Sequence, residues 1–393
     1  MLSGARREGL NDDQRLIVST IVGLASKFGE SYWHRIDREG NYPDEFVAEM
    51  GRLGMAGLPI PKEYGGAGYG LREASLVLEE INAAGGNAQP FHGQYYLSLM
   101  VARFASESWK ARYLPGLASG KLRLQTFALT EPEAGSESTK IKTSAVKKNG
   151  KYLIRGHKIF ISRLEHTDLV VLAARTTPLK DASRKTEGIS LFLVELKASK
   201  GLDIHKIETM FNSQTYEVFI DGLEVPEQNL IGEEGQGFGY ILGVLNPERV
   251  LLASECIGDA RWFIQKSVAY ANSRVVFDRQ IGSNQGVQFP IADTYAKMVA
   301  AEKVRWSAAE MYDSGGEDKS VGELANISKY LASECSWQAA NVAMDVYGGS
   351  GLATANHIER KFREARLYRV APVPQNLVLA YIAQSVLGLP RSY

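Results

Sequence analysis

Cysteine is scarce in this sequence, and its scarcity excludes two kinds of site. Cys256 and Cys335 are the only cysteines among 393 residues, and neither lies in a Cys-x-x-Cys motif or a Cys/His cluster. A disulfide framework and a structural zinc site both need more cysteines, or more closely spaced ligands, than these. We therefore expect no bound metal, two core thiols and a reducing compartment.

An excess of charge of either sign is also missing. Lysine plus arginine and aspartate plus glutamate both total 45, so the formal net charge is zero. Proteins that bind nucleic acid or an anionic membrane carry a basic footprint, so the balanced composition argues against both partners.

Long apolar runs are absent as well. No stretch approaches the roughly 18 apolar residues of a membrane-spanning helix, and Met1 to Gln14 lack the apolar segment of a signal peptide. We expect a soluble, cytoplasmic protein. The sequence also lacks a Gly-x-Gly-x-x-Gly motif between a strand and a helix, which argues against a Rossmann dinucleotide site.

The length and the 45% hydrophobic content are sufficient for a large core and two or three structural units. The first third has helical periodicity: Asn11 and Asp12 resemble an N-cap, and apolar residues return every three or four positions as far as Trp33. We expect one amphipathic helix there. Further helices are expected at Glu45–Leu53, Leu71–Ala83 and Tyr95–Ala105.

The period changes to that of β-strands between Leu122 and Pro226, where we expect about seven strands. A set of this size indicates a barrel or a sandwich. Asn149-Gly150 predicts a tight hairpin between two of them. The expected strands include Leu122–Leu129, Thr143–Lys147, Lys151–Ser162, Asp168–Arg175, Gly188–Leu196 and Thr215–Ile220.

The last third again has helical periodicity, with short connections that favour an antiparallel bundle. The expected helices are Phe238–Arg274, Gly286–Tyr312, Val321–Tyr347, His357–Tyr368 and Gln375–Val386.

The loop Thr130–Ser136, TEPEAGS, interrupts the strand pattern with proline, glycine and hydroxyl residues. Converging amide groups in such a loop can hold a phosphate or the polar edge of a planar ring, and the hydroxyls add further donors. The run FALTEPEAGS, followed after a hairpin by GHKIFIS, resembles the flavin-binding segment of the acyl-CoA dehydrogenase family. Motifs similar to that family recur in order from about Leu10 to Pro390.

The resemblance implies a multi-domain α and β fold: an N-terminal helical domain over residues 1–121, a middle β-barrel over 122–232 and a C-terminal helical bundle over 233–393. It also implies FAD as cofactor, an acyl-CoA substrate of fatty acid metabolism and an electron-transfer flavoprotein as electron acceptor. A homotetramer is usual in the family. The implied reaction removes the α-proton of the thioester to a carboxylate and the β-hydrogen as hydride to the flavin.

The resemblance also assigns residues to the flavin. The loop and strand that would hold the ring contribute Phe127, Leu129, Thr130, Gly135, Ser136, Phe160, Ile161 and Ser162. The family's R-x-x-F motif and its downstream glutamine match Arg274, Phe277 and Gln285, which would meet the pyrophosphate and adenine from a neighbouring subunit. Gly348 and Gly349 match a glycine turn of the family.

Glu248 is the candidate base. Many members of the family place this glutamate before the last helix, where the present sequence has Pro372, and proline cannot accept a proton. Other members place it on the helix after the barrel, where Glu248 lies between apolar neighbours and next to Arg249. A glutamate in apolar surroundings suits the removal of a weakly acidic proton. Glu255, two turns further along, is the alternative.

Substrate contacts are expected from Ser136, Asn246, Arg249, His92 and Tyr95. Proline also lacks the N–H that polarises the thioester carbonyl in the family, so either Val373 supplies this donor or the acyl group binds differently. Two alternatives remain open: a nitroalkane oxidase or flavin monooxygenase of the same fold, and a flavoprotein that binds nucleic acid and has lost catalysis.

Overall fold

The computed structural model describes residues 9–391, and this part of the chain divides into two compact units. The first unit combines the residues up to Glu39, the segment Gly70–Ala88 and the residues from Asn246 onward. The second unit combines Gly40–Tyr69 with Gln89–Leu245. The prediction about a signal segment falls partly on residues 1–8, which lie outside the described residues.

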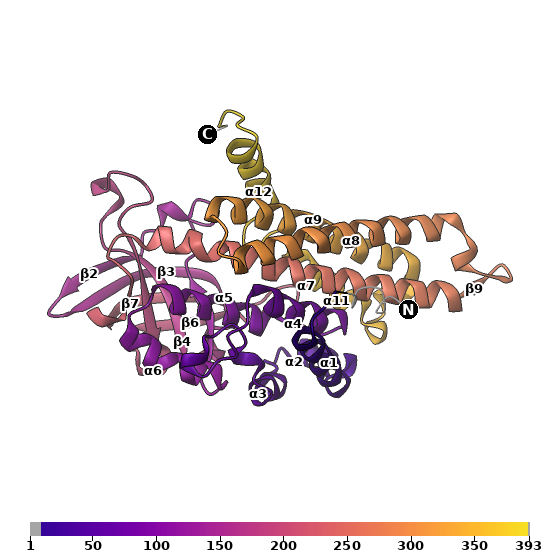
Figure 1. Ribbon diagram of the computed structural model, residues 1–393, viewed down its shortest axis with the longest axis horizontal. Coiled ribbons are helices and arrows are strands. Elements are labelled where there is room, and N and C mark those ends of the chain that lie inside the picture. Colours follow the sequence, from indigo (N-terminus) through magenta and orange to yellow (C-terminus); the bar gives the residue numbers. More distant parts are fainter. Residues whose placement is uncertain (1–8, 392–393) are drawn as a thin grey trace. The chain divides into compact units, whose positions relative to one another are not determined.

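The predicted succession of helices, β-sheet and helices along the chain is confirmed (Figure 1). The helices before the sheet are α1 Asp12–Lys27, α2 Glu30–Glu39, α3 Asp44–Arg52, α4 Leu71–Ala83, α5 Gln89–Phe104 and α6 Glu107–Ala118. Those after it are α7 Gly237–Ser273, α8 Gln285–Asp313, α9 Asp318–Tyr347, α10 Gly349–Leu352, α11 Ile358–Leu367 and α12 Gln375–Tyr381. Between residues 9 and 391, no helix combines the length and hydropathy of a membrane span.

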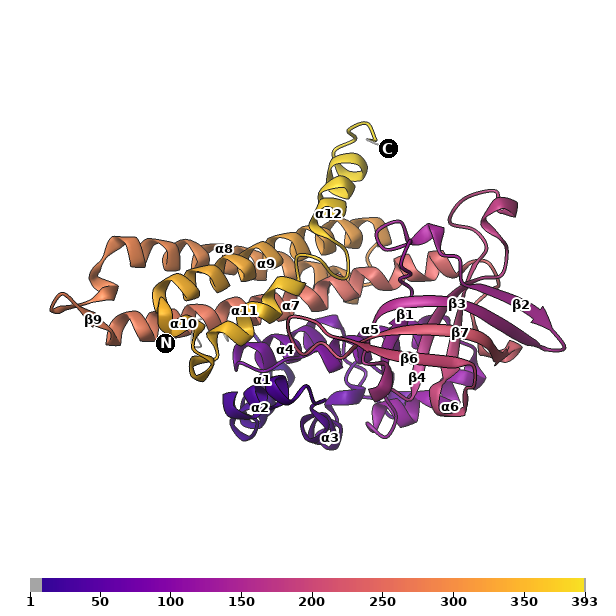
Figure 2. The ribbon, with the colours of Figure 1, turned by 180° about the vertical axis from the view of Figure 1, so that it is seen from behind.

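The strands of the second unit gather into one sheet (Figure 2). Over the described residues it has eight strands, in the order β6-β7-β3-β2-β4-β5-β8 with β1 paired to β4. Their bounds are β1 Leu124–Ala128, β2 Ser144–Lys148, β3 Lys151–Ser162, β4 Leu169–Arg175, β5 Ile189–Glu195, β6 Leu202–Ile207, β7 Thr215–Pro226 and β8 Leu230–Ile231. Asn149 and Gly150 both have positive φ, 51° and 73°, so the predicted tight hairpin joins β2 to β3.

The sheet wraps around a single apolar cluster to which both of its halves contribute. Ile154 on β3 and Val218 on β7 belong to the same cluster as Leu172 on β4 and Phe192 on β5. A sheet whose two halves bury side chains against each other is barrel-like, as the strand pattern predicts.

The first unit is built on the long helices α7, α8 and α9, which lie side by side in both views (Figures 1 and 2). Their facing sides and α11 form one core, which includes Phe263, Met298 and Ala339. Cys256 and Cys335 both belong to this core as free, buried thiols, which confirms the prediction made for them. Val275–Val276 (β9) and Arg279–Gln280 (β10) form a hairpin between α7 and α8.

Three boundaries in the first third differ from the sequence-based expectation. The first predicted helix is split into α1 and α2 next to Gly29, and glycine is a poor residue for a helix interior. Helix α5 begins at Gln89 rather than Tyr95, with Pro90 in its first turn, where a missing N–H is tolerated. Helix α6 was not predicted, although Ser106 caps it by accepting from the N–H of Trp109.

The N-cap of α1 is confirmed in detail. The side chain of Asn11 accepts from the N–H of Gln14 at 2.8 Å, and the side chain of Gln14 accepts from the N–H of Asn11 at 3.1 Å. This reciprocal pair satisfies two amide groups that the helix itself leaves free. Gln14 also donates to Glu73 of α4 at 2.7 Å, which joins two helices of the first unit.

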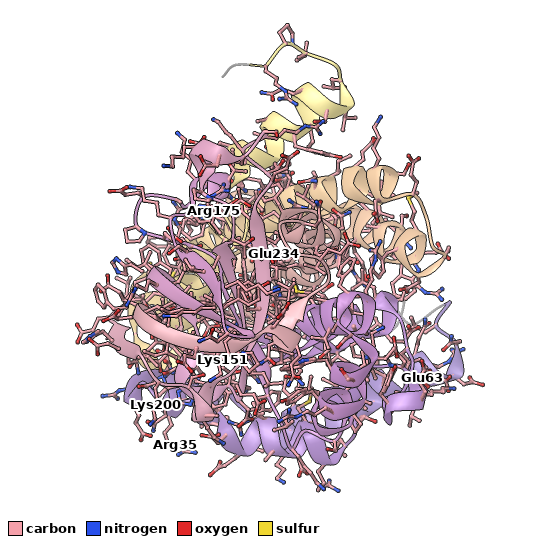
Figure 3. The ribbon with its side chains drawn as sticks, turned by 90° about the vertical axis from the view of Figure 1, so that its left-hand side faces the viewer. Arg35, Glu63, Lys151, Arg175, Lys200 and Glu234 are labelled. Atoms are coloured by element: carbon pink, nitrogen blue, oxygen red, sulfur yellow. The ribbon has the colours of Figure 1, made fainter. Side chains whose placement is uncertain are left out.

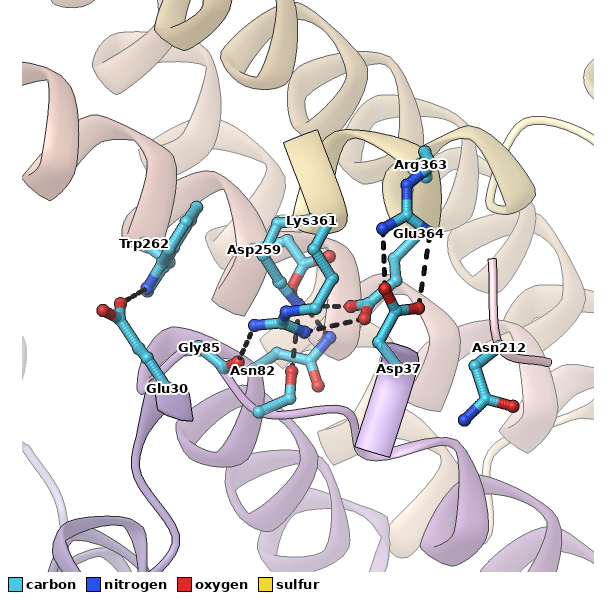
Figure 4. A network of polar contacts seen from close by, with 12 residues as sticks. Glu30, Asp37, Asn82, Gly85, Asn212, Asp259, Trp262, Lys361, Arg363 and Glu364 are labelled. Carbon is cyan, nitrogen blue, oxygen red and sulfur yellow. Dashed lines mark hydrogen bonds and ion pairs between the residues drawn. The ribbon is translucent and has the colours of Figure 1, made fainter. Parts of the chain in front are cut away.

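A buried polar network crosses the core of the first unit (Figure 4). Lys361 of α11 lies 2.5 Å from Asp259 of α7 and 3.0 Å from Glu364, and it donates to the carbonyl of Gly86 at 2.9 Å. Asn82 of α4 donates to Asp259 at 2.9 Å. Burial raises the pKa of Asp259 to about 7, and the charge of Lys361 opposes this rise. The network therefore holds a carboxyl group that titrates near neutral pH.

We expect Asp259→Asn to remove part of the pH dependence of stability. Because the pKa of Asp259 lies at about 7 in the folded protein and near 3.8 in the unfolded chain, the folded state binds more protons in that window. Its free energy of unfolding therefore falls as pH rises from about 4 to 7, by roughly 1–4 kcal/mol for this group. Denaturant titrations across this pH range should show a smaller fall in Asp259→Asn than in wild type.

The matched control is Asp293→Asn on α8, where the carboxylate is exposed and pairs with Lys297. We expect this variant to keep the wild-type fall between pH ~4 and ~7. An unchanged pH slope in Asp259→Asn would contradict a titrating carboxyl group in the network.

Candidate active site

The residues expected at the flavin ring gather in the second unit, where the end of β1 meets the end of β3. The hydroxyl of Thr126 on β1 donates to the carbonyl of Ser162 on β3 at 2.9 Å. The N–H of Ile159 donates to the carbonyl of Thr130 at 3.0 Å. Strand and loop residues that are about 30 positions apart in the sequence thus form one continuous surface segment.

Phe160 projects outward from this segment because β3 contains a bulge. The pairing of β3 with β7 shifts between Lys158 and Ile161, and the side chains of these two residues point into the sheet core. Phe160 between them has a φ of 57° and an exposed fraction of 61%. Bulges beside active sites commonly redirect a side chain in this way, and the exposed ring suits contact with a planar ligand.

The loop after β1 offers the donors that a flavin requires. Within residues 9–391 the N–H groups of Gly135 and Ser136 donate to no acceptor, and a Cβ on Gly135 would meet nothing within 4 Å. Free amides beside open space, an exposed aromatic ring and the Ser136 hydroxyl are a donor set that fits the polar edge of a flavin. The residues present therefore fit the ring half of FAD.

Two charged side chains that were not among the predicted site residues, Lys158 and Glu131, hold this loop from inside the sheet. Lys158 of β3 is fully buried, and its ammonium lies 2.8 Å from a carboxylate oxygen of Glu131. Burial pushes the pKa of Glu131 up, but the charge of Lys158 and the N–H of Lys142 lower it overall. A signal was present in the sequence, because Lys158 occupies an inward position in the alternation of β3.

His92 and Tyr95, both expected to contact the substrate, lie on α5 in the second unit. His92 is 8% exposed and packs edge-on against Tyr96 at 5.5 Å between ring centroids. Tyr95 is fully buried, and its hydroxyl donates to the carbonyl of Met55 at 2.8 Å. The hydroxyl of Tyr95 is thus bonded inside the unit and its ring lies in the core, and the substrate contact from Tyr95 stays a prediction.

The candidate base lies in the first unit on α7. Glu248 is 6% exposed, as its apolar neighbours in the sequence led us to expect. Arg249 donates to the side-chain oxygen of Asn246 at 3.3 Å, and Asn246 donates to the carbonyl of Asp318 at 3.2 Å. Three of the predicted site residues thus occupy a single turn of one helix, and two of them hold each other in place.

A second cation lies near this turn. Lys329 of α9 is fully buried, and its ammonium has no hydrogen-bond partner within the described residues. Burial lowers the pKa of Lys329 to about 8, and the charge of Arg249 contributes to that shift. Burial likewise lowers the pKa of Arg249, an effect that the charge of Glu248 opposes. The turn therefore carries one cation, Arg249, next to Glu248, and a second cation, Lys329, interacts electrostatically with Arg249.

Glu255, the alternative base, belongs to different surroundings. It is 1% exposed, and its backbone carbonyl accepts from Asn82 at 3.3 Å in the buried network around Asp259. The turn at Pro372 contains no carboxylate, and the next residue with an N–H is Val373. That N–H donates to no acceptor within residues 9–391.

The residues expected at the adenylate half of FAD cluster at the far end of the long helices. Arg274 and Phe277 belong to the β9–β10 hairpin, and Gln285 begins α8. Phe277 is 93% exposed with a φ of 51°. The hydroxyl of Tyr270 donates to Ser350 at 3.4 Å, which brings the Gly348-Gly349 turn to the same end. These residues form a second surface segment, exposed and aromatic.

Comparison with known proteins identifies the family. The model of the acyl-CoA dehydrogenase N-terminal domain matches residues 11–121, that of the middle domain residues 126–223 and that of the C-terminal domain residues 235–387. Together these matches extend over most of the chain.

Relatives align over nearly the full length. The acyl-CoA dehydrogenase FadE12 of Mycobacterium tuberculosis is 33% identical over 386 residues, covering 98% of each chain. An acyl-CoA dehydrogenase of Bacillus subtilis is 35% identical, covering 90% of this chain and 92% of its own. The solved structure of butyryl-CoA dehydrogenase from Megasphaera elsdenii superposes with a TM-score of 0.90 at 26% identity, covering 96% and 99%. The chain belongs to the acyl-CoA dehydrogenase family, a family of oxidoreductases.

Proposed function

We propose that this chain catalyses the FAD-dependent α,β-dehydrogenation of an acyl-CoA thioester, with Glu248 as the base. The observation that carries the proposal is the burial of Glu248 on α7, next to Arg249, in a chain with proline at the other base position of the family. We further propose the domain division of the sequence analysis, namely residues 1–121, 122–232 and 233–393.

Glu248 accepts the α-proton of the thioester in this proposal. Glu248 is 6% exposed, so little bulk water competes with the substrate for this carboxylate. Arg249, whose charge interacts with Glu248, is the cation that stabilises negative charge as it develops on the substrate. Asn246 holds the Arg249 side chain at 3.3 Å and so fixes its direction. FAD, when bound, accepts the β-hydrogen as hydride.

The thioester carbonyl needs a hydrogen-bond donor that Pro372 cannot provide. The free N–H of Val373, one residue later, is the donor that we propose. Because this donor is a backbone N–H, it needs little reorganisation when negative charge develops on the thioester oxygen during the reaction.

FAD must be shared between two subunits if the assignments hold. From Glu248 to Arg274 the chain follows α7 for 26 residues, which corresponds to about 39 Å along the helix axis. A flavin beside Glu248 cannot reach the Arg274 group of its own chain over that distance. We therefore propose that Arg274, Phe277 and Gln285 serve a neighbouring subunit, within a homotetramer.

The exposed residues near that end of the helices support subunit contact. Phe277 and Phe289 are exposed to 93% and 60%. A groove between α7 and α8 is lined by apolar side chains that include Val268, Ile291 and Tyr295. Apolar surface of this kind marks an interaction site more often than a free face. An electron-transfer flavoprotein is the proposed acceptor of the electrons, as the family resemblance implies.

A second function is favoured by one observation, the unusual turn at Pro372. A nitroalkane oxidase or flavin monooxygenase of this fold would need no thioester donor at that turn. Rapid reoxidation of the reduced protein by O₂, together with the absence of reduction by any acyl-CoA, would support this alternative over a dehydrogenase.

The first test of the proposal is the identity of the cofactor. We expect the purified protein to be yellow and to release FAD rather than FMN, because the Arg274 to Gln285 segment has a function only if an adenylate half is present. Chromatography of the flavin released by heat identifies it. Release of FMN, or a colourless protein that neither flavin stabilises, would refute the assignment.

Glu248→Gln tests the base. Glutamine keeps the size and helix propensity of the side chain but cannot take the proton, so flavin reduction by an acyl-CoA should slow by roughly 10²- to 10⁴-fold. Flavin content and acyl-CoA binding should stay near wild type. Anaerobic stopped-flow measurement of flavin bleaching gives the rate.

Glu255→Gln is the matched comparison on the same helix. Because Glu255 lies in the buried network around Asp259, this variant should alter stability more than the rate of flavin reduction. If Glu248→Gln reduces its flavin at the wild-type rate, or Glu255→Gln shows the larger loss, Glu248 is not the base.

Ser136→Ala tests the loop that we assign to the flavin ring. Removing one hydroxyl typically costs about 0.5–1.5 kcal/mol, so flavin or substrate binding should weaken by roughly 2- to 10-fold while the fold persists. Equilibrium titration with FAD and the KM for an acyl-CoA provide the two readouts. Wild-type values for both would show that the loop is only a surface turn.

A further inference from the structure

A lysine occupies a core position of the sheet, against the usual pattern. Lys158 follows Tyr152 and Ile154 on the inward-facing side of β3 and is as fully buried as they are. The side chains around it are apolar and include Ala128, Val170 and Val218. Lysine is almost never fully buried without a partner, because removing its charge from water is costly. The contacts of the ammonium group must therefore offset the cost of burying this charge.

The ammonium of Lys158 contacts the loop after β1 from the core side of the sheet. It donates to the carbonyl of Leu129 at 2.9 Å and to a carboxylate oxygen of Glu131 at 2.8 Å. These two residues flank Thr130, and both Leu129 and Thr130 belong to the proposed flavin contacts. Lys158 itself faces the core, so it contacts the loop without facing a ligand.

Glu131 extends the attachment to the next strand. Its carboxylate accepts from the N–H of Lys142 at 2.6 Å and from the N–H of Thr143 at 3.0 Å, immediately before β2. Together with Lys158, and with Ile159 through the carbonyl of Thr130, these donors fix a stretch of three loop residues. Charge-assisted hydrogen bonds of this type are short and strong, and they are stronger still where water is excluded.

Within residues 9–391, Glu131 is the one carboxylate that pairs with Lys158 and supports its charge. Burial lowers the pKa of Lys158 to about 8, while the charge of Glu131 opposes the shift. Arg175 of β4, which lies on the same sheet (Figure 3), is another charged group that interacts with Glu131. Arg175 directs its guanidinium to backbone carbonyls, such as Ile141 at 3.1 Å, rather than to Glu131. Lys158 and Glu131 are therefore both charged at neutral pH and depend on each other.

We propose that Lys158, through its ion pair with Glu131, is a positioning residue for FAD that fixes the Leu129–Glu131 segment in its flavin-binding geometry. The inference rests on the proposed function, because it presumes that this loop holds the flavin ring. It adds a residue that touches neither flavin nor substrate and that acts from inside the sheet.

Lys158→Met is the direct test, since methionine fills an apolar core of this size but donates no hydrogen bond. FAD affinity, measured by quenching of flavin fluorescence, should fall by roughly 10- to 100-fold, the effect expected when hydrogen bonds from a charged donor are lost. The matched control is Lys151→Met on the same strand, whose ammonium is exposed and pairs with Glu224 at 2.7 Å. That variant should keep the wild-type affinity.

The pH dependence of FAD affinity shows whether Lys158 acts through its charge or through a general effect on folding. Wild-type FAD affinity should weaken between pH ~7 and ~9 as Lys158 loses its proton, whereas the affinity of Lys158→Met should not change over this range. Lys158→Arg should restore binding and remove the weakening, because a guanidinium stays charged. If Lys158→Met fails to fold, Glu131→Gln supplies the same test from the other partner.

These measurements distinguish a failure of the positioning role of Lys158 from a failure of the proposed function. A wild-type protein that binds no FAD refutes the assignment of the flavin site itself. A wild-type protein that binds FAD, with equal affinity and an equal pH profile in Lys158→Met, refutes the positioning role alone.

Discussion

The pairing of buried charge is the constraint on which both units depend. Inside the sheet, the ammonium of Lys158 is stable only because Glu131 and the carbonyl of Leu129 replace its water. Inside the helical unit, Lys361 is stable because Asp259, Glu364 and the carbonyl of Gly86 surround it. Removing one partner of such a set would leave the other charge buried and unpaired, which costs far more than a surface ion pair contributes.

These pairs also explain how irregular segments are held. The loop after β1 has few apolar contacts of its own, and several of its residues are exposed. Hydrogen bonds from the buried lysine attach it to the core of the sheet. A binding loop on a rigid scaffold keeps its geometry without a stable structure of its own. The bulge at Phe160 serves the same surface by turning one aromatic ring outward while the flanking residues stay in the core.

Helix α7 imposes the second constraint, which is one of length. It carries Glu248 near its beginning and leads to Arg274 at its end, and a helix is a rod of fixed rise per residue. No adjustment of side chains can bring these two groups together within one chain. Under the proposed function, this separation requires that the residues assigned to one cofactor come from two copies of the chain.

Much of the fold could be predicted from the sequence because periodicity is a local property. Long helices such as α8 and α9, the strands β3, β4 and β5, the Asn149-Gly150 hairpin and the Asn11 cap follow from patterns within a few residues. The errors occur where a single residue competes with a pattern. Gly29 divides what reads as one helix. The apolar periodicity of α6 is too weak to reveal that helix from the sequence.

The sequence by itself determined which residue types are available to the site. It supplied a glutamate at position 248, a proline at 372 and a small-residue loop at Thr130–Ser136, and these residue types limit the chemistry that the chain can perform. Only the tertiary structure decided what those residues contact. The hydroxyl of Tyr95 donates to the carbonyl of Met55, Glu255 belongs to the Asp259 network, and Lys158 supports the loop. Each of these contacts joins positions that are far apart in the sequence. Periodicity reports which face of an element is buried, but the partner that a buried polar group finds is set by packing, and packing is decided by the whole chain at once.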